Sequence, residues 1–180
     1  PGAGNQGRGD PQAPVVHPSL PVRNRKELID YAKANPGKLA YGSVGNGTSH
    51  HLGMEELKKR TGTFMVHVPY KGMGPVLTDL IGNNIQVAFG NTPNEVEYVK
   101  AGSLRPIAVA HARRVAQLPD IPTFDELGYK GFESNSWYVY FAPGQTPPAI
   151  LDVLNRTLVD ILTEPKVRDY LTGQGVEIMA

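Results

Sequence analysis

The segment KLAYGSVGNGTSHHLGMEELKKRTG, residues 38–62, has the pattern of a strand, a loop and a helix in immediate succession. KLAYGS is typical of a short strand, and the three glycines that end it and follow it are typical of a loop. The remainder predicts a helix with Thr48 as its N-cap, because a threonine hydroxyl accepts a hydrogen bond from the first helical turn. This order predicts one βα unit with a glycine-rich loop at the carboxyl end of its strand.

The alternation of strands and helices continues on both sides of this unit. A helix capped by Asn24 and stopped at Pro36 and Gly37 precedes it. The later elements are expected as a strand at residues 63–68, a helix within 72–84, a strand at 85–90, a helix within 92–103 with Thr92 as cap, and a strand at 104–112. Such intervals predict an α/β fold with a mostly parallel sheet flanked by helices.

The two ends of the chain differ from this repeat. Residues 1–14 are rich in glycine and proline, so we expect them to be disordered or a remnant, with order beginning near Val15. Residues 134–143 predict a long aromatic strand that leaves the sheet. An amphipathic helix with Ile150, Leu154, Leu158 and Ile161, a last helix at 166–171 and a strand at 175–179 are expected after it. We interpret Trp137, Tyr138 and Tyr140 as core side chains between the tail and the sheet.

Composition excludes several classes of function. The 180 residues have a net charge of +1 and scattered basic residues, which argues against a nucleic-acid partner. The absence of cysteine excludes disulfides, thiol nucleophiles and zinc–thiolate sites. No apolar run approaches the roughly 20 residues that span a bilayer. Because the chain starts at Pro1 without a methionine or a signal segment, we interpret it as a processed or trimmed product.

The glycine loop does not match the nucleotide-binding motifs. A P-loop requires a lysine after its last glycine, and a dinucleotide fingerprint requires a third glycine where His50 stands. The general chemistry of a helix N-terminus is still available, because its free N–H groups and positive dipole end attract anions. A carboxylate suits such a loop as well as a phosphate does. An ordinary glycine turn capped by Thr48 fits the same spacing.

Two further loops, at residues 69–74 and 90–92, also follow a strand and open a helix. In an open α/β sheet, ligands bind beyond the carboxyl ends of the strands, where such loops gather. The three loops therefore predict one shared ligand site. Its candidate ligand-binding residues are Ser43, Gly45, Asn46, Gly47, Thr48, Ser49, His50, Tyr70, Lys71, Gly72, Gly90 and Asn91.

Three longer segments carry a family resemblance. VVHPSLPVRNRKELIDYAKANPGKLAYGSVGNGTSHHLGMEELKKRTG, VHVPYKGMGPVLTDLIGNNIQVAF and SWYVYFAPGQTPPAIL resemble the solute-binding proteins of tripartite tricarboxylate transporters, the Bug family, over residues 15–180. The resemblance implies a periplasmic receptor of two α/β lobes that closes on a small organic carboxylate and serves membrane transporter subunits. It implies no cofactor and no catalytic residue. The loop at residues 43–51 is then expected to meet the ligand carboxylate.

The resemblance also implies a division of the chain. Residues 15–134 are expected to form the second ligand-binding lobe, and residues 135–180 a hinge strand with a remnant of the first lobe. Family members extend further at both ends, so the first lobe is expected to be truncated. Family members also commonly carry an aspartate at the position of Gly90. The glycine of this chain therefore removes a negative charge from the expected site.

Two alternatives stay open from the residues alone. A small α/β hydrolytic or transferase enzyme would need Ser43 or Ser49 activated by a histidine, but the G-x-S-x-G elbow is absent. His51 and Glu55 have a spacing that metals use, yet no third ligand is evident, and we interpret them as a solvated helix face. The second alternative is a folded fragment that binds no ligand and self-associates. Apolar surface on the tail predicts a homodimer or exchange of the tail between protomers.

Overall fold

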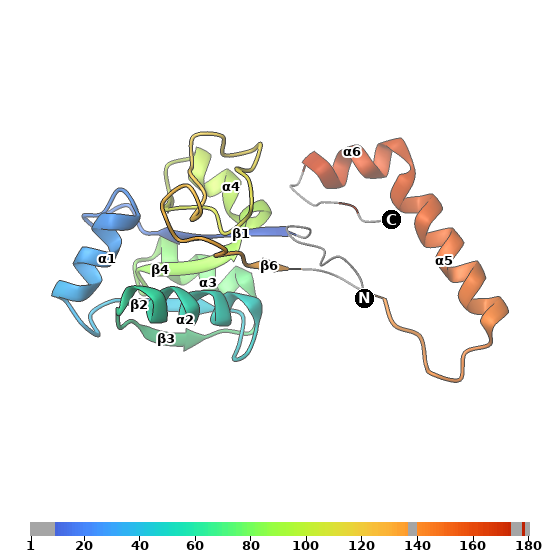
Figure 1. Ribbon diagram of the computed structural model, residues 1–180, viewed down its shortest axis with the longest axis horizontal. Helices are drawn as coiled ribbons and strands as arrows, with labels where there is room; N and C mark the ends of the chain where they lie inside the picture. The colour runs from blue at the N-terminus through green and yellow to red at the C-terminus, as the bar shows by residue number, and fades with distance from the viewer. Residues whose placement is uncertain (1–9, 137–139, 174–177, 179–180) are drawn as a thin grey trace.

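The computed structural model describes residues 10–136, 140–173 and 178. The chain forms an α/β lobe and a helical arm that extends away from it (Figure 1). In the described part of the chain, one sheet runs in the order β3-β2-β4-β1-β5, and β6 pairs with the free end of β1. The strands are β1 (Asp10–Val16), β2 (Ala40–Ser43), β3 (Val66–Pro69), β4 (Val87–Asn91), β5 (Arg105–Pro106) and β6 (Asn135–Ser136).

The sheet is mixed rather than mostly parallel throughout. Strand β2 is parallel to β3 and β4, as the βα alternation predicts, whereas β1 runs antiparallel to β4, β5 and β6. The α/β fold class is therefore confirmed, and the antiparallel strand is the feature that local patterns did not reveal. Although α1 connects β1 to β2, the direction of β1 is set by its pairing with β4 and β5, which come much later in the chain.

Residues 10–14 form part of a central strand, and the expectation that order begins near Val15 is wrong. All seven residues of β1 are buried. The carbonyl groups of Gln12 and Pro14 accept hydrogen bonds from Ala110 and Ile107, at 2.7 and 3.0 Å. Proline lacks a donor but keeps its carbonyl, so two prolines do not prevent this strand from pairing. The composition of residues 10–14 gave no sign of this central place in the sheet, which is set by pairing with β4 and β5.

The helices agree closely with the predicted ones. Asn24 accepts from the backbone N–H of Glu27, and Thr48 accepts from that of His51, so both predicted caps are confirmed. The third cap is different: the helix begins at Thr92, whose hydroxyl donates to the carbonyl of Pro11 at 2.9 Å. The helices are α1 (Arg25–Ala34), α2 (Ser49–Thr61), α3 (Met73–Ile81), α4 (Thr92–Lys100), α5 (Pro148–Thr163) and α6 (Pro165–Gly173).

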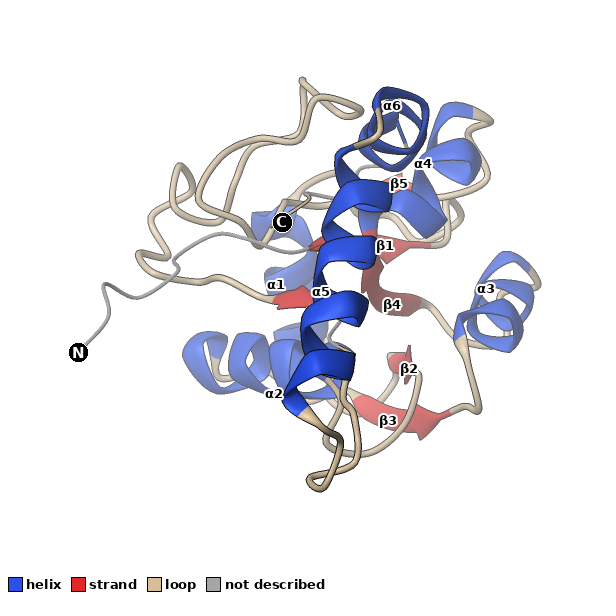
Figure 2. Ribbon diagram, turned by 90° about the vertical axis from the view of Figure 1, so that its right-hand side faces the viewer, coloured by secondary structure: helices blue, strands red, loops and turns tan. Residues whose placement is uncertain are grey.

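Helices cover both faces of the sheet (Figure 2). Phe89 points into a core with Tyr41, Phe124 and residues of α1 and α2. The preceding residue, Ala88, points to the other face, where it meets buried side chains of α3. Successive residues of a strand face opposite sides of its sheet, so β4 is apolar on both. Because both faces of β4 are packed, the end of this strand and the start of the loop that follows it have a defined position.

The tail leaves the lobe after β6. Tyr140 and Phe141 are 80% and 90% exposed, so the interpretation of Tyr140 as a core residue is wrong. Trp137 and Tyr138 lie outside the described residues, as does most of the strand expected at 175–179. No residue of α5 is buried within the described structure, and five of its large apolar side chains are exposed. None of the helices in the described part of the chain is long and apolar enough to cross a membrane.

Candidate functional site

The register of the sheet brings the three predicted loops to one edge. Ser43 at the end of β2 pairs with Pro69 at the end of β3, and Gly42 pairs with Ala88 of β4. Because these strands are parallel, the loops that follow them share the carboxyl edge, as the sequence predicts. The first residues of β1 and the whole of β6 also lie at this edge, since β1 is antiparallel to both β4 and β6.

The glycine loop between β2 and α2 is held by side chains at both of its ends. Gly45 and Gly47 have φ angles of 131° and 76°, which favour glycine. The Ser43 hydroxyl accepts from the N–H of Gly45 at 3.2 Å, and the Thr48 hydroxyl donates to its carbonyl at 2.8 Å. The N–H of Gly47 donates to Nδ1 of His51 at 3.1 Å. The loop thus has a fixed shape at the N-terminus of α2.

A stacked pair of imidazoles supports this loop from α2 and β3. The rings of His51 and His67 lie 4.1 Å apart and nearly parallel, and Nε2 of His67 is 2.6 Å from the Ser43 hydroxyl. Burial lowers the pKa of His67, and the neighbouring His51 adds to this effect. The two histidines therefore connect the end of β2 to the first turns of α2.

Glu55 belongs to the same network, and with a side chain that is 41% exposed it lies on a partly solvated helix face. Its carboxylate accepts from the Tyr41 hydroxyl and from the Lys58 ammonium, each at 2.6 Å. Burial alone would raise the pKa of Glu55, but these two hydrogen bonds outweigh it and lower the pKa. No group of three or more histidine or acidic side chains among the described residues could hold a metal ion.

A buried polar cluster lies where β1, β4, β6 and α2 meet. We call it the Gln12 cluster, after the side chain at its centre. The Gln12 amide nitrogen lies 2.8–3.0 Å from three acceptors, and the amide oxygen accepts from Ser134 at 2.6 Å. An amide nitrogen has only two hydrogens to donate, so the three acceptors share them. The cluster consists of Gln12, Ser49, Asn91, Ser134 and Ser136.

Sequence reasoning found only part of this cluster. Ser49 and Asn91 were predicted site residues, but their side chains point inward, to Gln12, and Ser136 donates to Asn91 at 2.9 Å. Gln12 was hidden in a glycine- and proline-rich segment. Ser134 and Ser136 carried a weak signal, because polar residues two apart share one face of a strand.

His50 lies beside the Gln12 cluster in the first turn of α2. It is 7% exposed, and neither ring nitrogen has a hydrogen-bond partner among the described residues. Burial lowers the pKa of the imidazole, and the nearby Asn91 side chain partly opposes that effect. Burial therefore favours the neutral form of the ring.

The remaining predicted residues differ in how far they are exposed to a ligand. The Tyr70 hydroxyl turns away from the glycine loop and donates to Asp79 at 2.7 Å; burial and this bond raise its pKa to about 12. Lys71 is exposed at the tip of its loop, and Gly72 precedes α3 with a φ of 150°. Gly90 is buried at the end of β4. Asn46 and Gly47 are exposed on the loop that joins β2 to α2.

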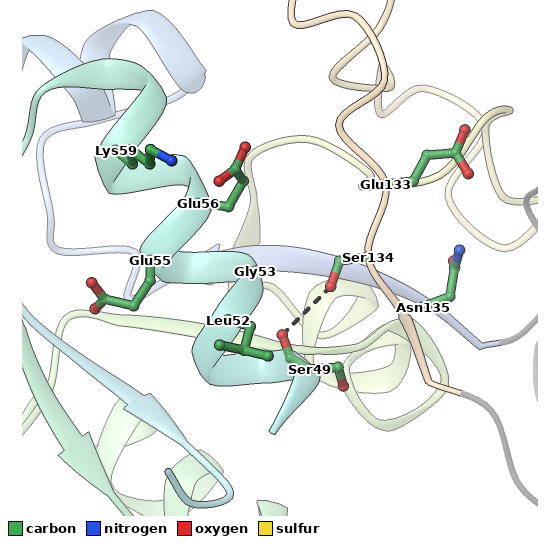
Figure 3. A pocket seen from close by; sticks show the side chains of 9 residues that line it. All are labelled: Ser49, Leu52, Gly53, Glu55, Glu56, Lys59, Glu133, Ser134 and Asn135. Atoms are coloured by element: carbon green, nitrogen blue, oxygen red, sulfur yellow. Dashed lines mark hydrogen bonds between the residues drawn. The ribbon is translucent and has the colours of Figure 1, made fainter. Parts of the chain in front are cut away.

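A pocket of about 650 Å³ lies beside α2 rather than over the glycine loop. Figure 3 shows it between this helix and residues 133–135, with the Ser134 hydroxyl hydrogen-bonded to the Ser49 carbonyl. Its lining carries the carboxylates of Glu55, Glu56 and Glu133 and one ammonium, that of Lys59. Glu55 is paired with Lys58 and Glu56 with Arg60, and we assign no ligand to this pocket.

The fold and the site together define a class of protein. An α/β lobe with polar loops at the carboxyl edge, and with β1 and β6 at that same edge, has the fold of periplasmic binding proteins. The chain belongs to the tripartite tricarboxylate transporter family of receptors, whose model matches residues 8–180. This is a family of transport receptors, not of enzymes.

Individual relatives agree with this assignment. Protein BugT of Bordetella pertussis is 34% identical over 161 residues, which cover 89% of this chain and 49% of BugT. The solved periplasmic binding protein BugD superimposes with a TM-score of 0.89 at 34% identity, over 94% of this chain and 56% of its own. The chain thus spans about half the length of the relatives that it matches.

Two solved relatives contain carboxylates. An R. palustris protein with adipate has a TM-score of 0.87 and 36% identity, over 94% of this chain and 56% of its own. MatC from Rhodopseudomonas palustris, with bound malate, has a TM-score of 0.86 and 26% identity, over 92% of this chain and 56% of its own.

Proposed function

We propose that this chain contains the carboxylate-binding lobe of an extracytoplasmic solute receptor. The lobe captures a small organic acid and presents it to the membrane subunits of a tripartite tricarboxylate-type transporter. The family description, and the adipate and malate in two solved relatives, support this proposal. Periplasmic location is part of it, supported by the relation to BugD.

The observation that carries the proposal is the shape of the glycine loop. Gly45 and Gly47 turn the backbone so that α2 begins at the carboxyl edge of the sheet. The first N–H groups of a helix have no internal acceptor, and Thr48 caps only that of His51. The N–H groups of Ser49 and His50 then face a ligand carboxylate at the positive end of the helix dipole.

Side chains have a smaller part in this proposed contact than the backbone has. The hydroxyls of Ser43 and Thr48 hold the loop, and that of Ser49 belongs to the Gln12 cluster. His50 contributes an unpartnered neutral ring next to the anion. Lys71 attracts the acid from a distance, through a charge that salt screens.

We further propose a division of the chain that the observed strand β1 modifies. Residues 10–134 form the ligand-binding lobe, because β1 lies at the centre of its sheet. Residues 135–180 contain the hinge strand and a remnant of the other lobe. The exposed apolar face of α5 supports this division, since none of the described lobe residues buries it.

Isothermal titration calorimetry on the 180-residue chain tests the proposed site, with succinate, adipate and citrate as probes. Gly47→Ala places a methyl group over the loop and is expected to weaken binding about tenfold or more. Gly62→Ala is the matched control, because Gly62 ends the same helix with a φ of 63° and also has open space around it. Each variant loses about 1 kcal/mol of stability to backbone strain.

The two glycine variants separate strain from ligand contact. Weaker binding by Gly47→Ala with unchanged binding by Gly62→Ala supports the loop as the anion site. Equal affinity in both variants and the parent would place the anion elsewhere. Absence of binding by all three acids would refute the proposed function for this chain.

A further inference from the structure

A carboxyl group without a partner lies next to the proposed ligand edge. Glu95, in the first turn of α4, is 1% exposed, and neither of its oxygens has a hydrogen bond among the described residues. Buried polar groups in folded proteins almost always have a partner, so an unsatisfied carboxyl group requires an explanation. Titratable groups in such strongly perturbing surroundings are enriched at functional sites.

The position of this carboxyl group depends on a glycine. A Cβ atom on Gly90 would collide with Oε1 of Glu95, and it would lie 2.6 Å from the terminal methyl group of Met73. The missing side chain at residue 90 therefore makes the space that the Glu95 carboxyl group fills. Met73, the first residue of α3, places its terminal methyl group against the same face of Gly90.

Gly90 stands at the carboxyl end of β4, next to Asn91 of the Gln12 cluster. Strand β4 is the direct neighbour of β2, whose end opens into the glycine loop. Neighbouring strands lie about 5 Å apart, so the two loops are within reach of one small molecule. Glu95 is thus an acidic group behind the same edge that presents the N-terminus of α2.

The burial of the Glu95 carboxyl group favours its neutral form. Burial raises its pKa well above the usual range, and no neighbouring charge opposes this effect. A protonated carboxyl group has one O–H to donate, whereas an ionised one can only accept. It can therefore bond to a carboxylate oxygen without adding a second negative charge to the site.

Resting on the proposed function, we propose that Glu95 is a specificity-determining residue whose protonated carboxyl group donates a hydrogen bond to a second carboxylate of the ligand. One ligand carboxylate meets the N–H groups of α2, and the other meets Glu95 after the flexible Met73 side chain moves aside. The site then prefers a diacid of about four carbons to a monoacid of the same length.

Three matched probes test this assignment by isothermal titration calorimetry on the 180-residue chain. Succinate has two carboxylates, butyrate has one on a skeleton of the same length, and aspartate adds an amino group to succinate. The variants are Glu95→Gln, which keeps a donor, and Glu95→Met, which removes it at similar volume. Glu97→Gln is the control, because Glu97 is exposed on the same helix and pairs with Lys100. Circular dichroism verifies that each variant is folded.

The expected result is a loss specific to one variant and one class of probe. Glu95→Met weakens succinate binding about tenfold, the usual effect of losing a hydrogen bond to a charged group, and leaves butyrate binding unchanged. Glu95→Gln and Glu97→Gln bind succinate within about threefold of the parent. If Glu95→Met fails to fold, the inference rests on Glu95→Gln, which must then retain both its fold and its preference for succinate over butyrate.

Other outcomes overturn the assignment. Butyrate and succinate binding that do not depend on residue 95 would refute it while leaving the proposed function intact. A preference of the parent for aspartate that Glu95→Gln abolishes would show an ionised acceptor instead of a neutral donor. Failure of all three probes to bind the parent would refute the proposed function, and this inference with it.

Discussion

The side chain of Gln12 contacts residues that are 37 to 124 positions away in the sequence. The local sequence does not reveal this role, because a glutamine between a proline and an alanine predicts no particular structure. Its partners arrive because β1 pairs with both β4 and β6. Glu95 shows the same dependence: its carboxyl group is buried because α4 packs against β1 and because residue 90 has no side chain.

At the residue scale we predict that Glu95 makes the stability of the protein depend on pH. The folded state keeps the proton because burial raises the pKa, whereas the unfolded state releases it above about pH 4.5. The contribution of protonated Glu95 to the free energy of unfolding is therefore fully present below that pH. It is lost as the pH rises toward and through the pKa of the folded state. Glu95→Gln removes the titration, so its advantage over the parent grows by up to about 1.4 kcal/mol per pH unit.

Urea denaturation of the parent and Glu95→Gln at pH 4, 5.5 and 7 measures this effect. Glu97→Gln serves as the control, because Glu97 is exposed. A constant difference between the parent and Glu95→Gln across the three pH values would show that Glu95 is not buried as a neutral acid.

At the scale of elements, α2 positions the glycine loop through close packing on β4. Gly53 allows this approach: a Cβ atom there would lie 2.5 Å from the Phe89 ring and 2.9 Å from the Ser134 hydroxyl. The helix carries the proposed anion contact at its first turn, and it joins the Gln12 cluster through Ser49. Its position against the sheet therefore determines the geometry of the candidate site.

We predict that Gly53→Ala destabilises the protein by roughly 1–3 kcal/mol, although alanine favours helices, because the aromatic ring and β4 must shift. Gly74→Ala is the matched control in α3, where the added methyl group meets nothing within 4 Å. That control is expected to be neutral or to stabilise by up to about 1 kcal/mol. Thermal unfolding compares the two, and equal effects would show that α2 does not pack tightly on Phe89.

At the scale of the whole molecule, the arm formed by α5 and α6 has an apolar surface without a partner in the described structure. Within that structure, it contacts the lobe through a hydrogen bond from Gln117 to the carbonyl of Thr172, at 3.2 Å. The exposed apolar residues of α5 are Ile150, Leu151, Val153, Leu154 and Ile161. A patch of this kind on a soluble protein is normally covered by another chain or by another part of the same one.

We therefore predict that the 180-residue chain forms a homodimer through α5. Leu154→Asp is expected to dissociate it, because it places a charge in the buried apolar face. Thr163→Asp adds the same charge on the polar side of the helix, which carries Asp152, Arg156 and Asp160, and is expected to leave the dimer intact. Sedimentation velocity at several protein concentrations measures the mass, and a monomeric parent at the highest concentration would contradict the prediction.

The approximate positions of α1 to α4 and of β2, β3 and β4 could be predicted from the sequence, because caps, glycine stops and apolar periodicity are local signals. The strand expected at residues 104–112 is wrong in its extent, since β5 contains only Arg105 and Pro106. The common edge of the three loops could also be predicted, since parallel strands place their carboxyl ends together. The direction of β1 could not, because its partners β4 and β5 lie far along the chain, and its two prolines are not typical of a central strand. The exposed state of Tyr140 could not either, since burial requires a surface to pack on.

The sequence by itself determined the α/β fold class, the capped helices and the family of this protein, because each is written in neighbouring residues or in ordered motifs. Only the tertiary structure decided that Gln12, Ser134 and Ser136 join Ser49 and Asn91, and that Glu95 fills the space above Gly90. The reason is physical. Strand pairing and burial bring distant residues within bonding distance, and neither leaves a local periodicity that a sequence can display.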